Sequence, residues 1–182
     1  MPDLRLEPLT DEHRADLDAL LQDPLVLRFT RYPDPLPDGY VSVVLDRYRT
    51  DDTRRGFVAR DETGAFVGVC MVVGLDREAE ECELGYMVAP AARGRGAATE
   101  MLRQLTAHAL GELQLQRVTL HIGADNPASE RVAERNGAAV DVHLLGIGVE
   151  HLHRVEDDRR EGLVHLDALD IADRLPRLRQ RR

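Results

Sequence analysis

The sequence of 182 residues contains no lysine and no tryptophan, and only two cysteines. All 24 basic side chains are therefore arginines. Without lysine the chain cannot form the G-K-[ST] end of a P-loop, which excludes that class of nucleotide site. Cys70 and Cys82 both fall inside expected strands, and no signal peptide precedes them. We therefore expect no disulfide framework and a reducing, cytoplasmic location.

Long hydrophobic runs and aromatic side chains are also scarce. No apolar stretch approaches the roughly 20 residues that cross a membrane, so no membrane partner is expected. Because aromatic residues make up only 4% of the chain, the core must be built mainly from Leu, Val and Ala. The net charge of −9 gives no indication of a nucleic-acid-binding surface. The acidic surface either serves solubility or attracts cationic amines and basic peptides.

Hydrophobic periodicity predicts a single α+β domain over residues 1–173. Its core would be a mixed, mostly antiparallel central sheet flanked by helices, with one parallel crossover through the helix at 96–113. Residues 26–38 are expected to be turn-rich, residues 150–161 to form a charged turn, and residues 174–182 to form a flexible basic tail. The expected strands cover 4–8, 56–61, 65–75, 82–88, 117–122, 162–169 and, by looser alternation, 138–149; the other expected helices cover 10–23, 39–50 and 126–137.

The most informative stretch is residues 83–98, with the sequence ELGYMVAPAARGRGAA. A short strand ends before Pro90, and a glycine-punctuated turn then leads into a helix. The first turn of a helix has unpaired N–H groups and carries the positive end of the helix dipole. The turn therefore predicts an anion site suited to a phosphate or pyrophosphate, although a tight turn with solvated arginines is the alternative. The dinucleotide fingerprint G-x-G-x-x-G fails, because Thr99 stands at its last position.

Residues 93–98, read as RGRGAA, match the pattern [QR]-x-x-G-x-[GA], which is the acyl-CoA pyrophosphate signature of the GNAT N-acetyltransferases. The segments ELGYMVAPAARGRGAATEML and NPASERVAERNGA, from residues 83 and 126, resemble the Rim-type branch of ribosomal-protein N-terminal acetyltransferases. The likeness covers roughly residues 57–138. It implies the GNAT fold, with the acyl-CoA site at the turn between the strand ending at Val88 and the next helix.

This resemblance also implies an activity. The chain would be an acetyl-CoA-dependent N-acetyltransferase that moves the acetyl group directly to a primary amine, on a protein or peptide N-terminus or on a small molecule. Acetyl-CoA is then the co-substrate, no metal is needed, and the family habit suggests a homodimer. A non-catalytic acyl-CoA-binding or sensing domain of the same fold is the alternative.

Glu83 is the candidate general base, because it is a carboxylate in an otherwise apolar strand just before the turn. The strand period places it on one face with Gly85 and Met87. The alternative is a strand-edge glutamate in solvent. By resemblance, a backbone N–H at Met87 or Val88 polarises the thioester carbonyl. The resemblance assigns CoA binding to the turn, namely Arg93, Gly94, Arg95, Gly96, Ala97 and Ala98.

The helix after Asn126 carries the second family segment. Many GNAT proteins have a tyrosine there that acts as a general acid toward the leaving thiolate, but Ala133 stands at that position in this chain. The Rim-type branch instead has a serine, which matches Ser129, and its hydroxyl could donate to the leaving sulfur. The alternative is a serine that satisfies backbone groups at the helix start. Asn126 would contact the CoA arm, cap the helix, or do both.

The acceptor side is the least family-like part of the chain. By resemblance, Phe29, Arg31 and Tyr32, with Arg28, are candidate substrate contacts, and a variable loop with solvated side chains is the alternative. Two histidines at 151 and 153 are weak evidence for a metal site. His121 and His143 are interpreted as satisfied strand histidines rather than bases.

Overall fold

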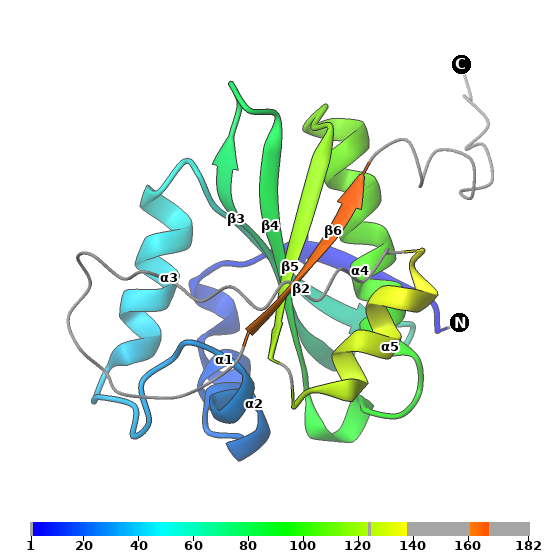
Figure 1. Ribbon diagram of the computed structural model, residues 1–182. Coiled ribbons are helices and arrows are strands. Elements are labelled where there is room, and N and C mark those ends of the chain that lie inside the picture. Colours follow the sequence, from blue (N-terminus) through cyan, green and yellow to red (C-terminus); the bar gives the residue numbers. More distant parts are fainter. Residues whose placement is uncertain (1, 124, 138–160, 168–182) are drawn as a thin grey trace.

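Six strands form one mixed sheet in a computed structural model that describes residues 2–123, 125–137 and 161–167 (Figure 1). The strands follow one another across the sheet in chain order, and only β4 and β5 are parallel. The expected mixed, mostly antiparallel sheet is thus confirmed. The strands are β1 (Leu4–Pro8), β2 (Arg55–Asp61), β3 (Phe66–Asp76), β4 (Glu81–Val88), β5 (Arg117–Gly123) and β6 (Glu161–Asp167).

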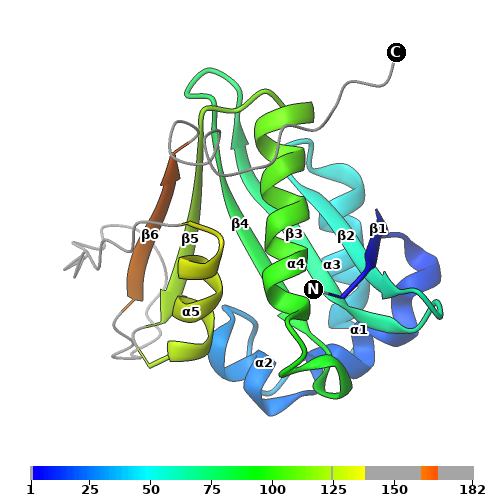
Figure 2. The same ribbon diagram turned by 90° about the vertical axis from the view of Figure 1, so that its right-hand side faces the viewer.

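Helices cover both faces of the sheet, as Figure 2 shows. One face packs against α4 and α5, and the other face packs against α1 and α3. The crossover from β4 through α4 to β5 is the expected parallel connection. The helices are α1 (Arg14–Leu21), α2 (Pro24–Phe29), α3 (Tyr40–Thr50), α4 (Ala97–Ala107) and α5 (Pro127–Arg135), with short helical turns at Asp11–His13, Pro90–Ala92 and His108–Glu112.

The alternation along β4 divides its side chains between two cores. Leu84 is buried with Met101 and Leu105 of α4, whereas Met87 is buried in the cluster that contains Leu17 of α1. Burying these apolar side chains on both faces fixes the register of β4, because a one-residue slip would exchange the two sets. Glu83 shares the parity of Met87, so its carboxylate lies on the face of α1 and α3.

Strands β4 and β5 are paired only at their beginnings. The parallel register joins residues 81–83 of β4 to residues 117–119 of β5 and then stops. Beyond that point the two strands diverge, and Figure 2 shows them opening toward α2 and α5. The gap between the diverging strands is the main feature that positions the site.

Helix α2 was not expected, and the interpretation of residues 26–38 as wholly turn-rich is wrong for its first residues. Pro24 stands at the first helical position, and the Asp23 carboxylate accepts hydrogen bonds from the N–H groups of Leu25 and Val26, both at 3.1 Å. Aspartate followed by proline is a helix start, because proline has no N–H to leave unpaired there. The same arrangement was correctly expected at Asn126 and Pro127.

The remaining expectations have mixed outcomes. A strand at 162–169 is confirmed as β6, and Gly137 follows α5 with a left-handed φ of 84°. The expected strand at 138–149, the charged turn up to residue 160, His143, the two histidines at 151 and 153, and the tail at 174–182 lie outside the described residues. Within the described ranges, no helix has the length and apolar character needed to cross a membrane.

Candidate active site

The turn before α4 presents a row of backbone N–H groups. Gly94 and Gly96 have φ angles of 74° and 82°, the left-handed region that glycine adopts without strain. A Cβ at Gly94 would meet no atom within 4 Å, so the space beside it is open. Among the described residues, none accepts a hydrogen bond from the N–H groups of residues 94–99. These donors and the positive end of the α4 dipole form a site that fits a pyrophosphate.

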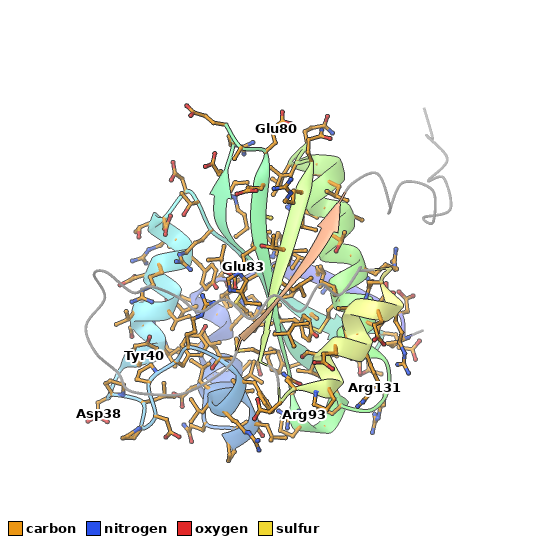
Figure 3. All side chains as sticks on the ribbon, viewed as in Figure 1. Asp38, Tyr40, Glu80, Glu83, Arg93 and Arg131 are labelled. Atoms are coloured by element: carbon orange, nitrogen blue, oxygen red, sulfur yellow. The ribbon has the colours of Figure 1, made fainter. Side chains whose placement is uncertain are left out.

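The two arginines of the turn point to different surroundings. Arg95 is exposed. The guanidinium of Arg93 donates to the Asp23 carboxylate at 2.6 and 3.3 Å and to the Val88 carbonyl at 3.1 Å. Figure 3 shows Arg93 at the same end of the molecule as α2. Arg93 therefore holds the turn, the end of β4 and the start of α2 together.

The ladder between β3 and β4 determines which backbone N–H groups face the gap. Ala89 donates to Val67 at 2.8 Å, which marks those two residues as a hydrogen-bonded pair. Because such pairs alternate along an antiparallel ladder, Met87 is bonded to Val69, whereas Val88 belongs to a pair that is not hydrogen-bonded. The N–H of Val88 therefore points away from β3, toward the gap. Of the two positions expected from the sequence, only Val88 has its donor on the side of the gap.

Glu83 lies on the sheet face opposite α4, near the centre of the view in Figure 3. Its carboxylate is 3.8 Å from the guanidinium of Arg31, and 30% of its side chain is exposed. The same guanidinium lies 2.6 Å from Nδ1 of His121, which must accept because arginine has only donors. A pocket of about 210 Å³ lies at this point, lined by Glu83, Val73, Gly74, Glu81, Cys82, Thr119 and His121.

The candidate acceptor residues do not all reach this pocket. Arg31 does, through its contacts with Glu83 and His121. Phe29 is half-buried, and Arg28 stacks on its ring and donates to Asp125 at 2.7 Å. Tyr32 packs against the cluster of α1 and α3, edge-on to the Tyr40 ring at 6.0 Å, and burial raises its pKa. His121 is a satisfied strand histidine, as expected, because it lies in β5 and its Nδ1 accepts from Arg31; its place in the pocket with Glu83 was not expected.

On the opposite face, α5 brings the second family segment to the gap. The Asn126 side chain accepts from the Ser129 N–H at 3.2 Å, which confirms the expected cap. Ala133 is fully buried in the core. Tyr86 of β4 approaches Ser129, and burial raises the pKa of Tyr86 to about 12 while the Ser129 hydroxyl opposes the shift. The two hydroxyls lie close enough to influence each other but form no regular hydrogen bond, and the buried Tyr86 Oη has no partner among the described residues.

The arrangement agrees with an acyl-CoA site, since the donors at 94–99 and the Val88 N–H lie at the same end of β4, where that strand is not paired with β5. Within the described residues, no three His, Cys, Asp or Glu side chains are placed to hold a metal ion.

Comparisons with known proteins identify relatives of the chain. The sequence profile of the family described as "Acetyltransferase (GNAT) domain" matches residues 3–139. A Bacillus subtilis protein named "Putative ribosomal N-acetyltransferase YdaF" is 34% identical over 74 residues, which are 41% of this chain and 40% of that protein. A spermidine N(1)-acetyltransferase of Vibrio cholerae is 23% identical over 95 residues, 52% of this chain and 55% of that protein. These matches span about half, or less, of each relative.

The fold is also found among solved structures. The crystal structure of spermidine N-acetyltransferase from Vibrio cholerae in complex with CoA and spermine superposes with a TM-score of 0.79. The superposition covers 93% of this chain and 98% of that protein at 17% sequence identity. The expected GNAT fold is therefore confirmed.

Proposed function

Because the chain belongs to the acetyltransferase (GNAT) family, we propose that it transfers an acetyl group from acetyl-CoA directly to a primary amine. One observation carries this proposal. Strand β4 brings a carboxylate at Glu83, a backbone donor at Val88 and the donor-rich turn at 94–99 into one line beside the gap. These are the groups that acyl transfer from a bound thioester to an amine requires.

Acetyl-CoA, when bound, supplies the acetyl group as a thioester. The N–H groups of residues 94–99 hold the pyrophosphate, and binding so far from the reacting atoms serves to position them. The Val88 N–H donates to the carbonyl oxygen, where negative charge develops. The Glu83 carboxylate accepts a proton from the amine, directly or through a water molecule, because an ammonium has no lone pair to attack with. The Ser129 hydroxyl donates to the departing sulfur.

Among amines, we infer from Arg31 a preference for a peptide or protein N-terminus over a polyamine, although the carboxylates of Glu81 and Glu83 line the same pocket. Arg31 places a guanidinium 3.8 Å from the Glu83 carboxylate and 2.6 Å from His121. A polyamine would bring several positive charges next to this guanidinium, and like charges repel. A peptide brings one amine, and carboxylates further along its chain can approach Arg31. The sequence likeness to the ribosomal-protein branch supports the same choice.

The test is a panel of acceptors with acetyl-CoA: peptides with free N-termini, spermidine and an aminoglycoside, with acetylated product measured by mass. Wild type and Glu83→Gln are compared with Glu62→Gln, which removes an exposed carboxylate from the turn between β2 and β3, outside the pocket. We expect product with wild type and Glu62→Gln, and a loss of about 10²- to 10⁴-fold with Glu83→Gln. Acetyl-CoA binding that does not depend on Glu83, with no product from any amine, would support the sensing domain instead.

We also propose a reducing compartment and a homodimer. The first is supported by Cys70 and Cys82, which are both buried free thiols. The homodimer rests on the family resemblance. Light scattering of the purified protein at several concentrations would decide the oligomeric state.

A further inference from the structure

The hydroxyl of Tyr86 is a buried polar group that has no hydrogen-bond partner in the part of the chain that the structure describes. Its Oη is inaccessible to solvent and forms no hydrogen bond with any described residue. Buried hydroxyls are nearly always paired, because an unpaired one loses its hydrogen bonds to water without replacement. The hydroxyls of Thr30, Thr99 and Thr106 are in the same state, but that of Tyr86 differs in its closeness to Ser129. A partner that arrives with the substrate would satisfy it.

The position of Tyr86 identifies that partner. Tyr86 has the same ladder parity as Val88, so its own N–H also faces the gap between β4 and β5. Its side chain extends on the α4 face and approaches Ser129 in the first turn of α5. The hydroxyl therefore lies beside the serine that is the candidate donor to the leaving sulfur.

The alanine at position 133 gives the location of the Tyr86 hydroxyl a possible chemical role. The side chain of Ala133 is a methyl group buried in the core, so α5 supplies no phenol of its own at that position. The phenol of Tyr86, from β4, instead approaches Ser129 from the side of the sheet. A tyrosine hydroxyl is thus still near the serine, as in the GNAT proteins with a tyrosine on this helix, but here it comes from β4 and not from α5.

We propose that Tyr86 Oη and Ser129 together donate hydrogen bonds to the sulfur of CoA as it leaves as a thiolate. This inference rests on the proposed acetyl transfer. The carbon–sulfur bond breaks with its electron pair on sulfur, the amine proton passes to Glu83, and Tyr86 retains its own proton. Burial keeps the phenol protonated, since it raises the pKa of Tyr86 to about 12. The hydroxyl is therefore available as a donor throughout the pH range in which the thiol ionises.

The test compares wild type with Tyr86→Phe, Ser129→Ala and the double variant. We expect Tyr86→Phe to lower kcat about tenfold to a hundredfold, the range for one hydrogen bond to a charged group, with little change in KM for acetyl-CoA. The double variant should lose less than the product of the two single effects, because both hydroxyls act on one atom. Thermal unfolding should show no loss of stability in Tyr86→Phe, since the removed hydroxyl has no hydrogen bond to any of residues 2–123, 125–137 and 161–167.

A second readout is independent of turnover. The thiol of bound CoA is titrated by its thiolate absorbance, with desulfo-CoA as the reference. Burial raises the pKa values of Cys70 and Cys82 to about 12, so neither cysteine contributes at lower pH. The pKa of the bound thiol should rise by about one pH unit in Tyr86→Phe. Thr106→Val is the matched control, because it removes another buried hydroxyl that is unpaired within the described ranges, from α4.

The outcomes separate the two proposals. Unchanged kcat and an unchanged thiol titration in Tyr86→Phe would overturn the role of Tyr86 and leave acetyl transfer standing. If wild type binds CoA but transfers no acetyl group, the proposed function fails, and the thiol titration still decides whether Tyr86 contacts the sulfur. Failure to bind CoA at all would overturn both.

Discussion

Arg93 and Asp23, 70 positions apart in the sequence, form a hydrogen-bonded ion pair with an N–O distance of 2.6 Å. The side chain of Asp23 is only 13% exposed. The same carboxylate caps α2, whose end leads to Arg31 beside Glu83. One ion pair therefore connects the turn that fits the pyrophosphate to the segment that approaches the acceptor pocket.

Replacing Asp23 separates its two roles. Asp23→Asn keeps a capping side chain but removes the charge, whereas Asp23→Ala removes both. We expect losses of about 1 kcal/mol in the free energy of unfolding for Asn and about 2 kcal/mol for Ala, measured by urea denaturation. Asp18→Asn, on an exposed part of α1, is the control and should cost almost nothing. Equal stability of all four proteins would contradict a structural role for the pair.

The contribution of Asp23 should depend on pH in a defined direction. The hydrogen bond from Arg93 holds the pKa of Asp23 below its usual value of 3.8, helped by the N–H of Val26 and opposed by partial burial. A carboxyl with a lowered pKa in the folded state stabilises the fold above its unfolded pKa and loses this effect as the pH falls. The stability difference between wild type and Asp23→Asn should therefore stay constant down to about pH 4 and shrink below it. A difference that grows on acidification would contradict this assignment.

The sequence predicted the parts of the fold that depend on local chemistry. Periodicity and turn residues were enough for the six strands and for α4, and Asn126 with Pro127 was enough for the start of α5. Helix α2 was missed, although Asp23 and Pro24 are also a capping residue followed by proline. The prolines from residue 33 onward favoured a turn-rich interpretation of the whole segment. Tyr86 was interpreted only as one member of an apolar strand.

The rest could not be predicted, because it depends on contacts between distant segments. Nothing local shows that the Arg93 side chain turns to Asp23, or that Arg31 reaches both Glu83 and His121. The choice between Met87 and Val88 needed the hydrogen-bond phase of the β3–β4 ladder, which a strand pattern alone does not give. The roles proposed for these residues stay predictions until they are measured.

The turn glycines can be tested by a matched pair of substitutions. Gly94 and Gly64 both have a positive φ, at 74° and 82°, and a Cβ at either position would meet no atom within 4 Å. Alanine should therefore cost each position a similar backbone strain of about 1–2 kcal/mol. Only Gly94→Ala should also reduce the rise in Tm that acetyl-CoA produces, because its methyl group stands where the pyrophosphate would bind. Equal Tm shifts in the two variants would remove residue 94 from the binding site.

The cysteines should be unreactive in the folded protein. Cys70 is 0% exposed and Cys82 is 3% exposed. Burial raises the pKa values of both thiols to about 12, so the reactive thiolate is rare at neutral pH. We expect no modification by a thiol dye in native buffer and two modified thiols in denaturant. Fast labelling of native protein would show that the core on the α4 face, which contains both cysteines, opens. It would also exclude dye-based assays of CoA release.

Arg31 should discriminate between acceptors if the proposed preference for peptide N-termini is right. Arg31→Met removes the positive charge 3.8 Å from Glu83 while keeping a long side chain. Exposed charge interactions are worth about 0.5–1 kcal/mol, so kcat/KM for spermidine relative to a peptide should rise roughly two- to fivefold. The KM for acetyl-CoA should not change, because Arg31 lies on the face of the sheet opposite α4. Arg49→Met, in an exposed ion pair of α3, is the control for removing an arginine elsewhere. A fall in spermidine use with Arg31→Met would show instead that this arginine helps to bind a polyamine-like acceptor.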